Sequence, residues 1–200
     1  MIQETSHSLP VSRAIHHAIP LHLKASARGS TMKLLTLMRH AKSSWDEAGL
    51  PDHLRPLNKR GRRDAPTMAT RLSSYGIRPD LLLSSDAVRC QMTLESLLDH
   101  LPWAGIALTQ EHRLYECSGE DILDVLSEQS DEAKHIFVLG HNPGLQQAFE
   151  QLSEHRAEKF PTSAVISLTL HIEQWHNIRT GCGEVTLYDA PKLALPTIIQ

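Results

Sequence analysis

The sequence predicts an α/β domain of three layers, with a mostly parallel central sheet and helices on both of its faces. From Lys33 onward, short apolar runs typical of buried strands alternate with segments whose apolar residues recur at helical spacing. The last two strand-like runs follow each other with no helix between them, which indicates an antiparallel hairpin. A chain of 200 residues is long enough to bury one substantial core.

The first strand is expected over 34–38, and the first helix over 58–75 with Asn58 as its cap. Pro66 lacks an amide donor, so a kink or a restart of this helix is expected there. A second strand covers 80–85. The helix that follows it is recognised by leucines spaced i, i+3, i+4 and i+7, which we expect on one buried face: Leu94, Leu97, Leu98 and Leu101.

A weaker strand is expected near 106–109, and the run SGED at 118–121 resembles a capping box that opens the next helix. The clearest strand is HIFVLG at 135–140. We expect Asn142 to cap the helix after it, with Pro143 as the first helical residue. The buried faces of these two helices are expected to carry Ile122, Val125 and Leu126, and then Leu145, Ala148, Phe149 and Leu152. Strands at 164–170 and 184–189 complete the sheet.

Residues 1–31 differ in composition from the rest, with one acidic residue and no clear hydrophobic period. We expect them to be a poorly ordered N-terminal extension of a domain that covers 32–200. Met32, directly before the first strand, is an alternative start of the protein. A segment that targets the chain to an organelle is a less favoured alternative.

Charge and composition exclude several classes of partner. A net charge of −3 and a pI near 6.5 argue against a nucleic-acid binder with a basic face. No apolar run approaches the roughly 18 residues needed to cross a bilayer. Three scattered cysteines favour a reducing, cytoplasmic location over a disulfide framework. Thirteen histidines are present, but none has the tight spacing of a metal motif, so we expect no metal and no cofactor.

Charged or polar side chains follow three of the predicted strands, and ligands of open α/β sheets bind beyond the carboxyl ends of strands. The first strand ends in Arg39-His40, and Arg89 lies one turn into the helix after the second strand. The fourth ends in Gly140-His141, at the amino terminus of a helix, where free amides favour anions. Two histidines and two arginines are therefore expected at one edge, which indicates a phosphate site.

These residue types suit phosphoryl transfer. A neutral imidazole can be a nucleophile that forms a phosphohistidine, and guanidinium groups bind phosphate oxygens in pairs. A carboxylic acid near the leaving group can supply its proton, and Glu116, in the loop after the third strand, is our candidate. The sequence lacks the cysteine-phosphatase loop, the DxDx[TV] motif of aspartyl-phosphate enzymes, the P-loop and the GxSxG elbow.

Five stretches in order resemble the histidine phosphatase superfamily, which has the phosphoglycerate-mutase-like fold, and within it the SixA-type phosphohistidine phosphatases. They are LMRHAKSSWD, RPLNKRGRRDA, LLLSSDAVRCQMT, LYECS and VLGHNPGL, and the similarity covers about 33–189. The resemblance implies that His40 is the phosphorylated nucleophile. It also implies that Arg39, Arg89 and His141 complete the phosphate pocket, that Ser43 contacts phosphate, and that Glu116 holds the acid position.

We therefore expect a metal-independent phosphatase that removes phosphate from phosphohistidine on a protein. Its partner would be that phosphorylated protein or a small phosphorylated metabolite. One alternative is a small-molecule phosphatase acting on a sugar phosphate or a nucleotide, and another is a module that binds phosphate without turnover. Ala41 and Lys42 stand where many relatives have glycine and where mutases have glutamate, which weakens the mutase interpretation.

Aromatic residues and histidines near these motifs are expected to be structural or at the surface. We interpret Trp45, Trp103 and Trp175 as packing residues, with the alternative that Trp45, which is close to His40, lines the pocket. We place His53 and His112 at surface positions.

Overall fold

The computed structural model describes residues 32–194 and 196–198, so the predicted N-terminal extension 1–31 lies outside the described residues. Seven strands form one sheet in the order β3-β2-β4-β1-β5-β6-β7. The first four in this order are parallel, and β5, β6 and β7 pair antiparallel. The strands are β1 Lys33–Arg39, β2 Leu81–Ser84, β3 Ala107–Gln110, β4 His135–Gly140, β5 Val165–Leu170, β6 Gly183–Asp189 and β7 Thr197–Ile198. The predicted α/β fold with a mixed sheet is confirmed.

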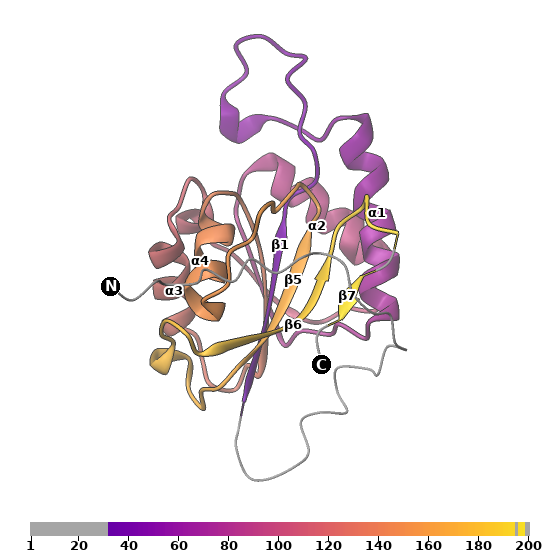
Figure 1. The fold of residues 1–200 in the computed structure, drawn as a ribbon. Coiled ribbons are helices and arrows are strands. Elements are labelled where there is room, and N and C mark those ends of the chain that lie inside the picture. Colours follow the sequence, from indigo (N-terminus) through magenta and orange to yellow (C-terminus); the bar gives the residue numbers. More distant parts are fainter. Residues whose placement is uncertain (1–31, 195, 199–200) are drawn as a thin grey trace, which may run out of the picture.

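Helices cover both faces of the sheet, as Figure 1 shows. The pair α1 (Lys59–Ser74) and α2 (Val88–His100) packs on one face, and the pair α3 (Gly119–Ser127) and α4 (Gly144–Ser153) packs on the other. Short 3-10 helices are η2 (Asp52–Leu54), η3 (His112–Leu114) and η4 (Trp175–Asn177). Strand β4 is buried along its whole length, because its alternate side chains enter the two cores.

The predicted caps of α1 and α3 are confirmed. The Asn58 side chain accepts a hydrogen bond from the Gly61 amide at 2.9 Å, and Ser118 and Asp121 form a reciprocal capping box. Helix α1 continues through Pro66, so the expected restart there is wrong. The carbonyl that loses its amide donor belongs to Arg62, an exposed residue, so water can satisfy it.

Two details of the predicted helices are wrong. Helix α4 begins at Gly144 with Pro143 in the cap position, and no side chain caps it. The Asn142 side chain instead donates from its amide nitrogen to the Phe160 carbonyl, and its oxygen has no hydrogen-bond partner among the described residues. Leu98 is 38% exposed, while the other three leucines of its predicted face are buried.

The carboxyl ends of the parallel strands meet at the edge of the sheet beneath the long connection from β1 to α1. In Figure 1 this connection, which includes η2, rises above the sheet. Among residues 32–194 and 196–198, no helix combines the length and the apolar character that crossing a membrane requires.

Candidate active site

The register of the sheet brings the predicted site residues together. Arg39 of β1 pairs with Gly140 of β4, and the His40 amide donates to the Gly140 carbonyl. The rings of His40 and His141 consequently lie 4.9 Å apart between centroids. All six predicted site residues line one pocket of about 270 Å³: Arg39, His40, Ser43, Arg89, Glu116 and His141.

The His40 ring is buried and held in one tautomer. Its Nδ1 lies 2.7 Å from the Ala41 carbonyl, which can only accept, so Nδ1 carries the proton and Nε2 keeps a lone pair. The Ala41 peptide is itself held, because its amide donates to Thr93 Oγ1 at 3.0 Å. Burial, followed by the neighbouring His141 and then the two arginines, lowers the pKa of His40 well below its usual range. The structure therefore presents a neutral imidazole, the form a nucleophile requires.

The His141 ring is also neutral. Burial and then the charge of Arg89 lower its pKa to about 3. Its Nε2 contacts Ser85 Oγ at 2.9 Å and Cys90 Sγ at 3.5 Å, whereas its Nδ1 has no hydrogen-bond partner among the described residues. Burial raises the pKa of Cys90 to about 12, so this thiol stays protonated. If Nε2 accepts from Ser85 and Cys90, Nδ1–H becomes a buried donor for a ligand oxygen.

Two predicted arginines supply positive charge at the pocket. Arg39 donates from Nη1 to the Phe160 carbonyl at 2.9 Å, and its buried Nε has no partner among the described residues. Burial and then the charge of Arg89 lower the pKa of Arg39. Arg89 donates to the Asp52 carbonyl at 2.7 Å and to the Asp52 carboxylate at 2.9 Å. These two bonds leave three of its five N–H donors for a phosphoryl group.

The sequence analysis assigned no role to Arg55 and Asp52, which also line the pocket. Arg55 is buried and donates to Ser43 Oγ at 2.9 Å and to the Asp52 carboxylate at 2.6 Å. Burial raises the pKa of Asp52, but hydrogen bonds from Arg55 and Tyr115 and the charge of Arg89 outweigh it and lower that pKa to about 2. Asp52 is therefore an ionised bridge between two arginines. The only signal in the sequence was the position of Arg55 inside the RPLNKRGRRDA stretch.

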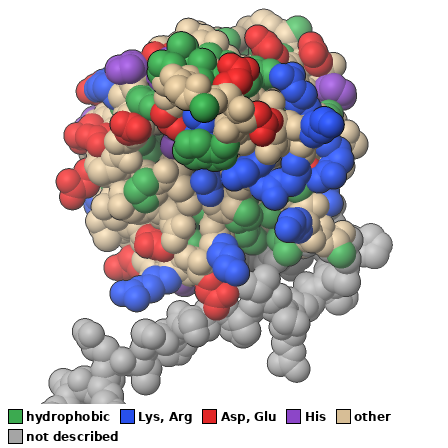
Figure 2. Space-filling view, turned by 90° about the horizontal axis from the view of Figure 1, so that it is seen from above, with side chains coloured by type: hydrophobic (Ala, Val, Ile, Leu, Met, Phe, Trp, Pro, Cys, Tyr) green, Lys and Arg blue, Asp and Glu red, His purple; other side chains and the backbone are tan. Residues whose placement is uncertain are grey.

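Trp45 lines the mouth of the pocket and is 72% exposed, so its interpretation as a packing residue is wrong. Its ring stacks on the Arg55 guanidinium, with the central carbon of the guanidinium 3.1 Å from the ring centroid. Trp103 and Trp175 are buried, as expected. Figure 2, which looks down on this edge of the sheet, shows Lys and Arg side chains gathered on one part of the face.

Glu116 lines the pocket from an exposed position, on a backbone in the left-handed region with φ of 50°. The other carboxyl group that lines the pocket, that of Asp52, remains ionised at neutral pH and cannot donate a proton. Asp52 is therefore excluded as the acid of the site, and the assignment of that role to Glu116 stays a prediction.

Comparisons with known proteins agree with this geometry. A family model described as histidine phosphatase superfamily (branch 1) matches residues 35–160. The chain is 38% identical over 137 residues to an uncharacterised chloroplastic protein of Arabidopsis thaliana, covering 64% of this chain but only 63% of that relative. It is 28% identical over 178 residues to the 2,3-bisphosphoglycerate-dependent phosphoglycerate mutase of Brucella ovis, covering 84% of this chain and 80% of the mutase. A solved structure of a proposed phosphohistidine phosphatase SixA from Agrobacterium tumefaciens matches with a TM-score of 0.67 at 27% identity, covering 80% of this chain and 98% of that one.

Proposed function

The chain belongs to the histidine phosphatase superfamily, and from this premise we propose that it hydrolyses phosphohistidine on a protein without a metal, with His40 as the nucleophile. The observation that carries the proposal is the state of His40, a neutral imidazole whose Nε2 lone pair is available in a pocket lined by Arg39 and Arg89. Three buried free thiols fit a reducing compartment, so a cytoplasmic location is part of the proposal.

The reaction proceeds in two steps. The substrate imidazole takes a proton from solvent on its unphosphorylated ring nitrogen, His40 Nε2 attacks phosphorus, and the P–N bond to the substrate breaks as the neutral imidazole leaves. Water then attacks the phosphorus of phospho-His40 and the new P–N bond breaks. One proton of the water passes to solvent, and hydrogen phosphate and neutral His40 are released. In both steps Arg39, Arg89 and the Nδ1–H of His141 bind the phosphoryl oxygens, on which negative charge is spread.

One feature of the pocket favours a protein substrate. The exposed Trp45 ring, backed by Arg55, offers a flat surface at the mouth on which a substrate side chain can stack. The protein from Agrobacterium that shares the fold at 27% identity is itself named for phosphohistidine.

A small phosphorylated metabolite is the second candidate substrate. The similarity to the Brucella mutase, a protein named for phosphoglycerate, over 84% of this chain supports it. Initial rates on a phosphohistidine peptide and on a panel of sugar phosphates and nucleotides separate the two. We expect kcat/KM for the peptide to exceed that for each metabolite, and the reverse order would contradict the protein-substrate proposal.

The nucleophile is tested by brief exposure to phosphorus-labelled substrate, followed by denaturation. We expect an acid-labile, alkali-stable adduct on His40 of the native protein. His40→Ala should fold normally but give neither adduct nor turnover. The control is His176→Gln, which changes an exposed histidine that does not line the pocket and should behave as the native protein does. Turnover by the His40→Ala protein would refute the assignment, and stoichiometric binding without phosphate release by the native protein would instead support a non-catalytic module.

A further inference from the structure

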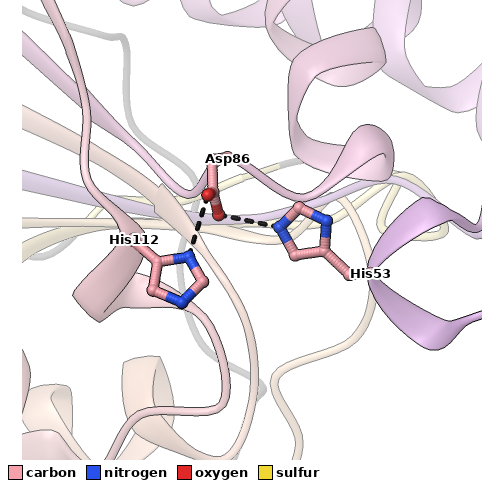
Figure 3. A group of neighbouring side chains, drawn as sticks. All are labelled: His53, Asp86 and His112. Atoms are coloured by element: carbon pink, nitrogen blue, oxygen red, sulfur yellow. Dashed lines mark hydrogen bonds and ion pairs between the residues drawn. The ribbon is translucent and has the colours of Figure 1, made fainter.

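Two histidines and an aspartate that are distant in sequence converge beside the pocket. His53 lies in η2, Asp86 follows β2, and His112 begins η3. His53 Nε2 lies 2.9 Å from one oxygen of Asp86, and His112 Nδ1 lies 2.8 Å from the other. Their ligand-type atoms all lie within 4.8 Å of one another. Figure 3 shows both rings turned toward the carboxylate.

This cluster is separate from the phosphate pocket. None of its three residues lines the pocket. The Tyr115 ring contacts both sites, with its centroid 4.9 Å from that of His53 and 5.5 Å from that of His141. A cation in the cluster would therefore have no direct access to the phosphoryl group, and its role would be structural.

We propose that His53, Asp86 and His112 form a binding site for Zn²⁺. Two imidazoles and one carboxylate are a ligand set that Zn²⁺ accepts, with water in the fourth position. Ligand atoms of a tetrahedral site with bonds of about 2.0 Å lie roughly 3.3 Å apart. The two nitrogen–oxygen distances are now hydrogen bonds of 2.9 and 2.8 Å, and all the ligand atoms lie within 4.8 Å of one another, so rotation of the side chains is enough to reach this spacing. Without metal, the ring nitrogen that faces Asp86 carries a proton, because the carboxylate accepts a hydrogen bond from it. Zn²⁺ binding would free the lone pair of this nitrogen and leave the proton on the other ring nitrogen.

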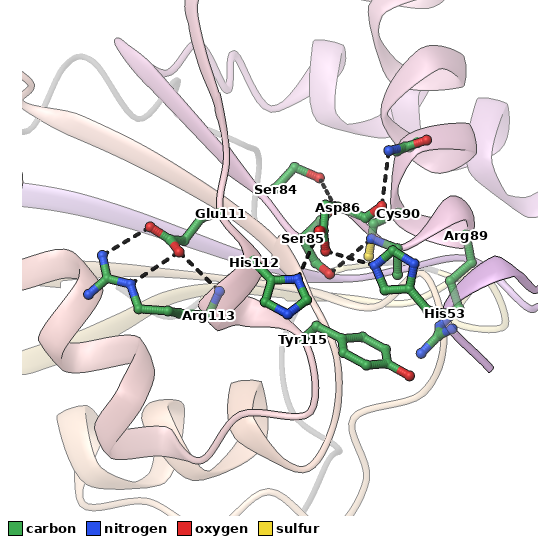
Figure 4. Close-up of polar contacts among 12 residues, drawn as sticks. His53, Ser84, Ser85, Asp86, Arg89, Cys90, Glu111, His112, Arg113 and Tyr115 are labelled. Atoms are coloured by element: carbon green, nitrogen blue, oxygen red, sulfur yellow. Dashed lines mark hydrogen bonds and ion pairs between the residues drawn. The ribbon is translucent and has the colours of Figure 1, made fainter. Parts of the chain in front are cut away.

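The segments that carry Asp86 and His112 are held in place without a metal. Gln91 donates from its side chain to the Asp86 carbonyl at 2.9 Å, and the Glu111 amide donates to the Ser84 carbonyl at 2.8 Å. The Glu111 carboxylate also accepts from the backbone and side chain of Arg113, as Figure 4 shows. The His112 side chain is 75% exposed, so it can rotate to close the distance to His53.

Metal binding would fix η2 over the active site. His53 is adjacent in sequence to Asp52, whose carboxylate and carbonyl hold Arg89. A Zn²⁺ ion that joins His53 to the loops after β2 and β3 would clamp this segment against the edge of the sheet. The inference is independent of the substrate proposed above.

The test is a titration of metal-free, full-length protein with Zn²⁺ in competition with a chromophoric chelator. We expect His112→Gln and His53→Gln each to bind one equivalent of Zn²⁺ fewer than the native protein, or to bind that equivalent about tenfold or more weakly. The exposed His176→Gln is the matched control and should bind as the native protein does. Four histidines within residues 1–31 can also bind Zn²⁺, so the readout is the difference of one equivalent between proteins: His7, His16, His17 and His22.

Hydrogen exchange gives a second measurement. If the three residues formed only a local hydrogen-bond network, the exchange rates would not depend on Zn²⁺. Zn²⁺ should slow exchange of the backbone amides of residues 52–55 in the native protein and in His176→Gln, but not in His112→Gln. Circular dichroism and the melting temperature without metal show whether each variant is folded. Equal binding by all the proteins, binding by none, or protection that persists in His112→Gln would overturn the proposal.

Discussion

His135 makes the stability of the domain sensitive to acid. It opens β4, is buried, and bonds through Nε2 to Thr36 Oγ1 at 2.9 Å. Burial lowers its pKa from 6.5 to about 4, against opposing effects of the Asp80 charge and the Arg78 carbonyl. As the pH falls below 6.5, His135 becomes protonated in the unfolded chain but stays neutral in the folded chain. Folding therefore becomes less favourable until the pH nears 4. At about 1.4 kcal/mol per pH unit, this interval lowers the free energy of unfolding by about 3 kcal/mol.

Urea unfolding of the native protein and of His135→Gln, from about pH 7 to about pH 4.5, measures this effect. Glutamine does not titrate, so the native protein should lose about 2.5 kcal/mol more than the variant over this range, which ends before the full effect is reached. Only the difference in pH dependence is decisive, because the substitution can also change stability at neutral pH. The exposed His176→Gln should follow the native curve. Parallel curves for the native protein and His135→Gln would show that the buried imidazole titrates normally.

Three further predictions concern the site. A Cβ at Gly61 would clash with the Lys42 carbonyl oxygen. In Gly61→Ala, a strain of about 1–3 kcal/mol should therefore outweigh the gain in helix propensity of about 1 kcal/mol and destabilise the domain. A melting temperature at or above the native value would contradict this. Glu116→Gln should slow hydrolysis of alkyl phosphates about 100-fold or more. It should slow hydrolysis of phosphohistidine less than about tenfold, because a protonated imidazole leaves without a proton from the enzyme. Equal losses in the two steady-state rates would argue against Glu116 as the acid. Trp45→Ala should leave the melting temperature unchanged and raise KM for a phosphohistidine protein about fivefold, with no change for acetyl phosphate; an equal rise for both substrates would remove Trp45 from protein recognition.

The sequence was sufficient to predict the central part of the site, because the site is built from the ends of strands. Buried parallel strands read as continuous apolar runs, so the residue that follows each run is easily located. The rule that ligands bind at the carboxyl ends then places His40 and His141 together without any knowledge of the register. The structure adds their separation of 4.9 Å and the carbonyl of Ala41 that sets the tautomer.

Apart from Ser43, the part of the site formed by the connection from β1 to α1 could not be predicted. This connection has no hydrophobic period, so no pattern in the sequence shows that the Arg55 side chain bonds to Ser43 or that Asp52 bonds to Arg89. The cluster of His53, Asp86 and His112 could not be predicted from the sequence for a related reason. Spacing rules find ligands on one element, whereas these three come from three separate loops.

The arginines that can bind a phosphoryl group also help to keep His40, the proposed nucleophile, neutral. Burial is the largest cause of the lowered pKa of His40, and the charges of Arg89 and Arg39 add to it. For His141, the charge of Arg89 is the second cause after burial. A phosphoryl dianion in the pocket would offset these charges and favour protonation of both imidazoles. His40 escapes this effect once its Nε2 is bonded to phosphorus, whereas His141 can take a proton as negative charge gathers on the phosphoryl oxygens. In the proposed mechanism, burial and the two arginines thus keep His40 neutral before attack, and the same arginines lie beside its phosphorylated form afterwards.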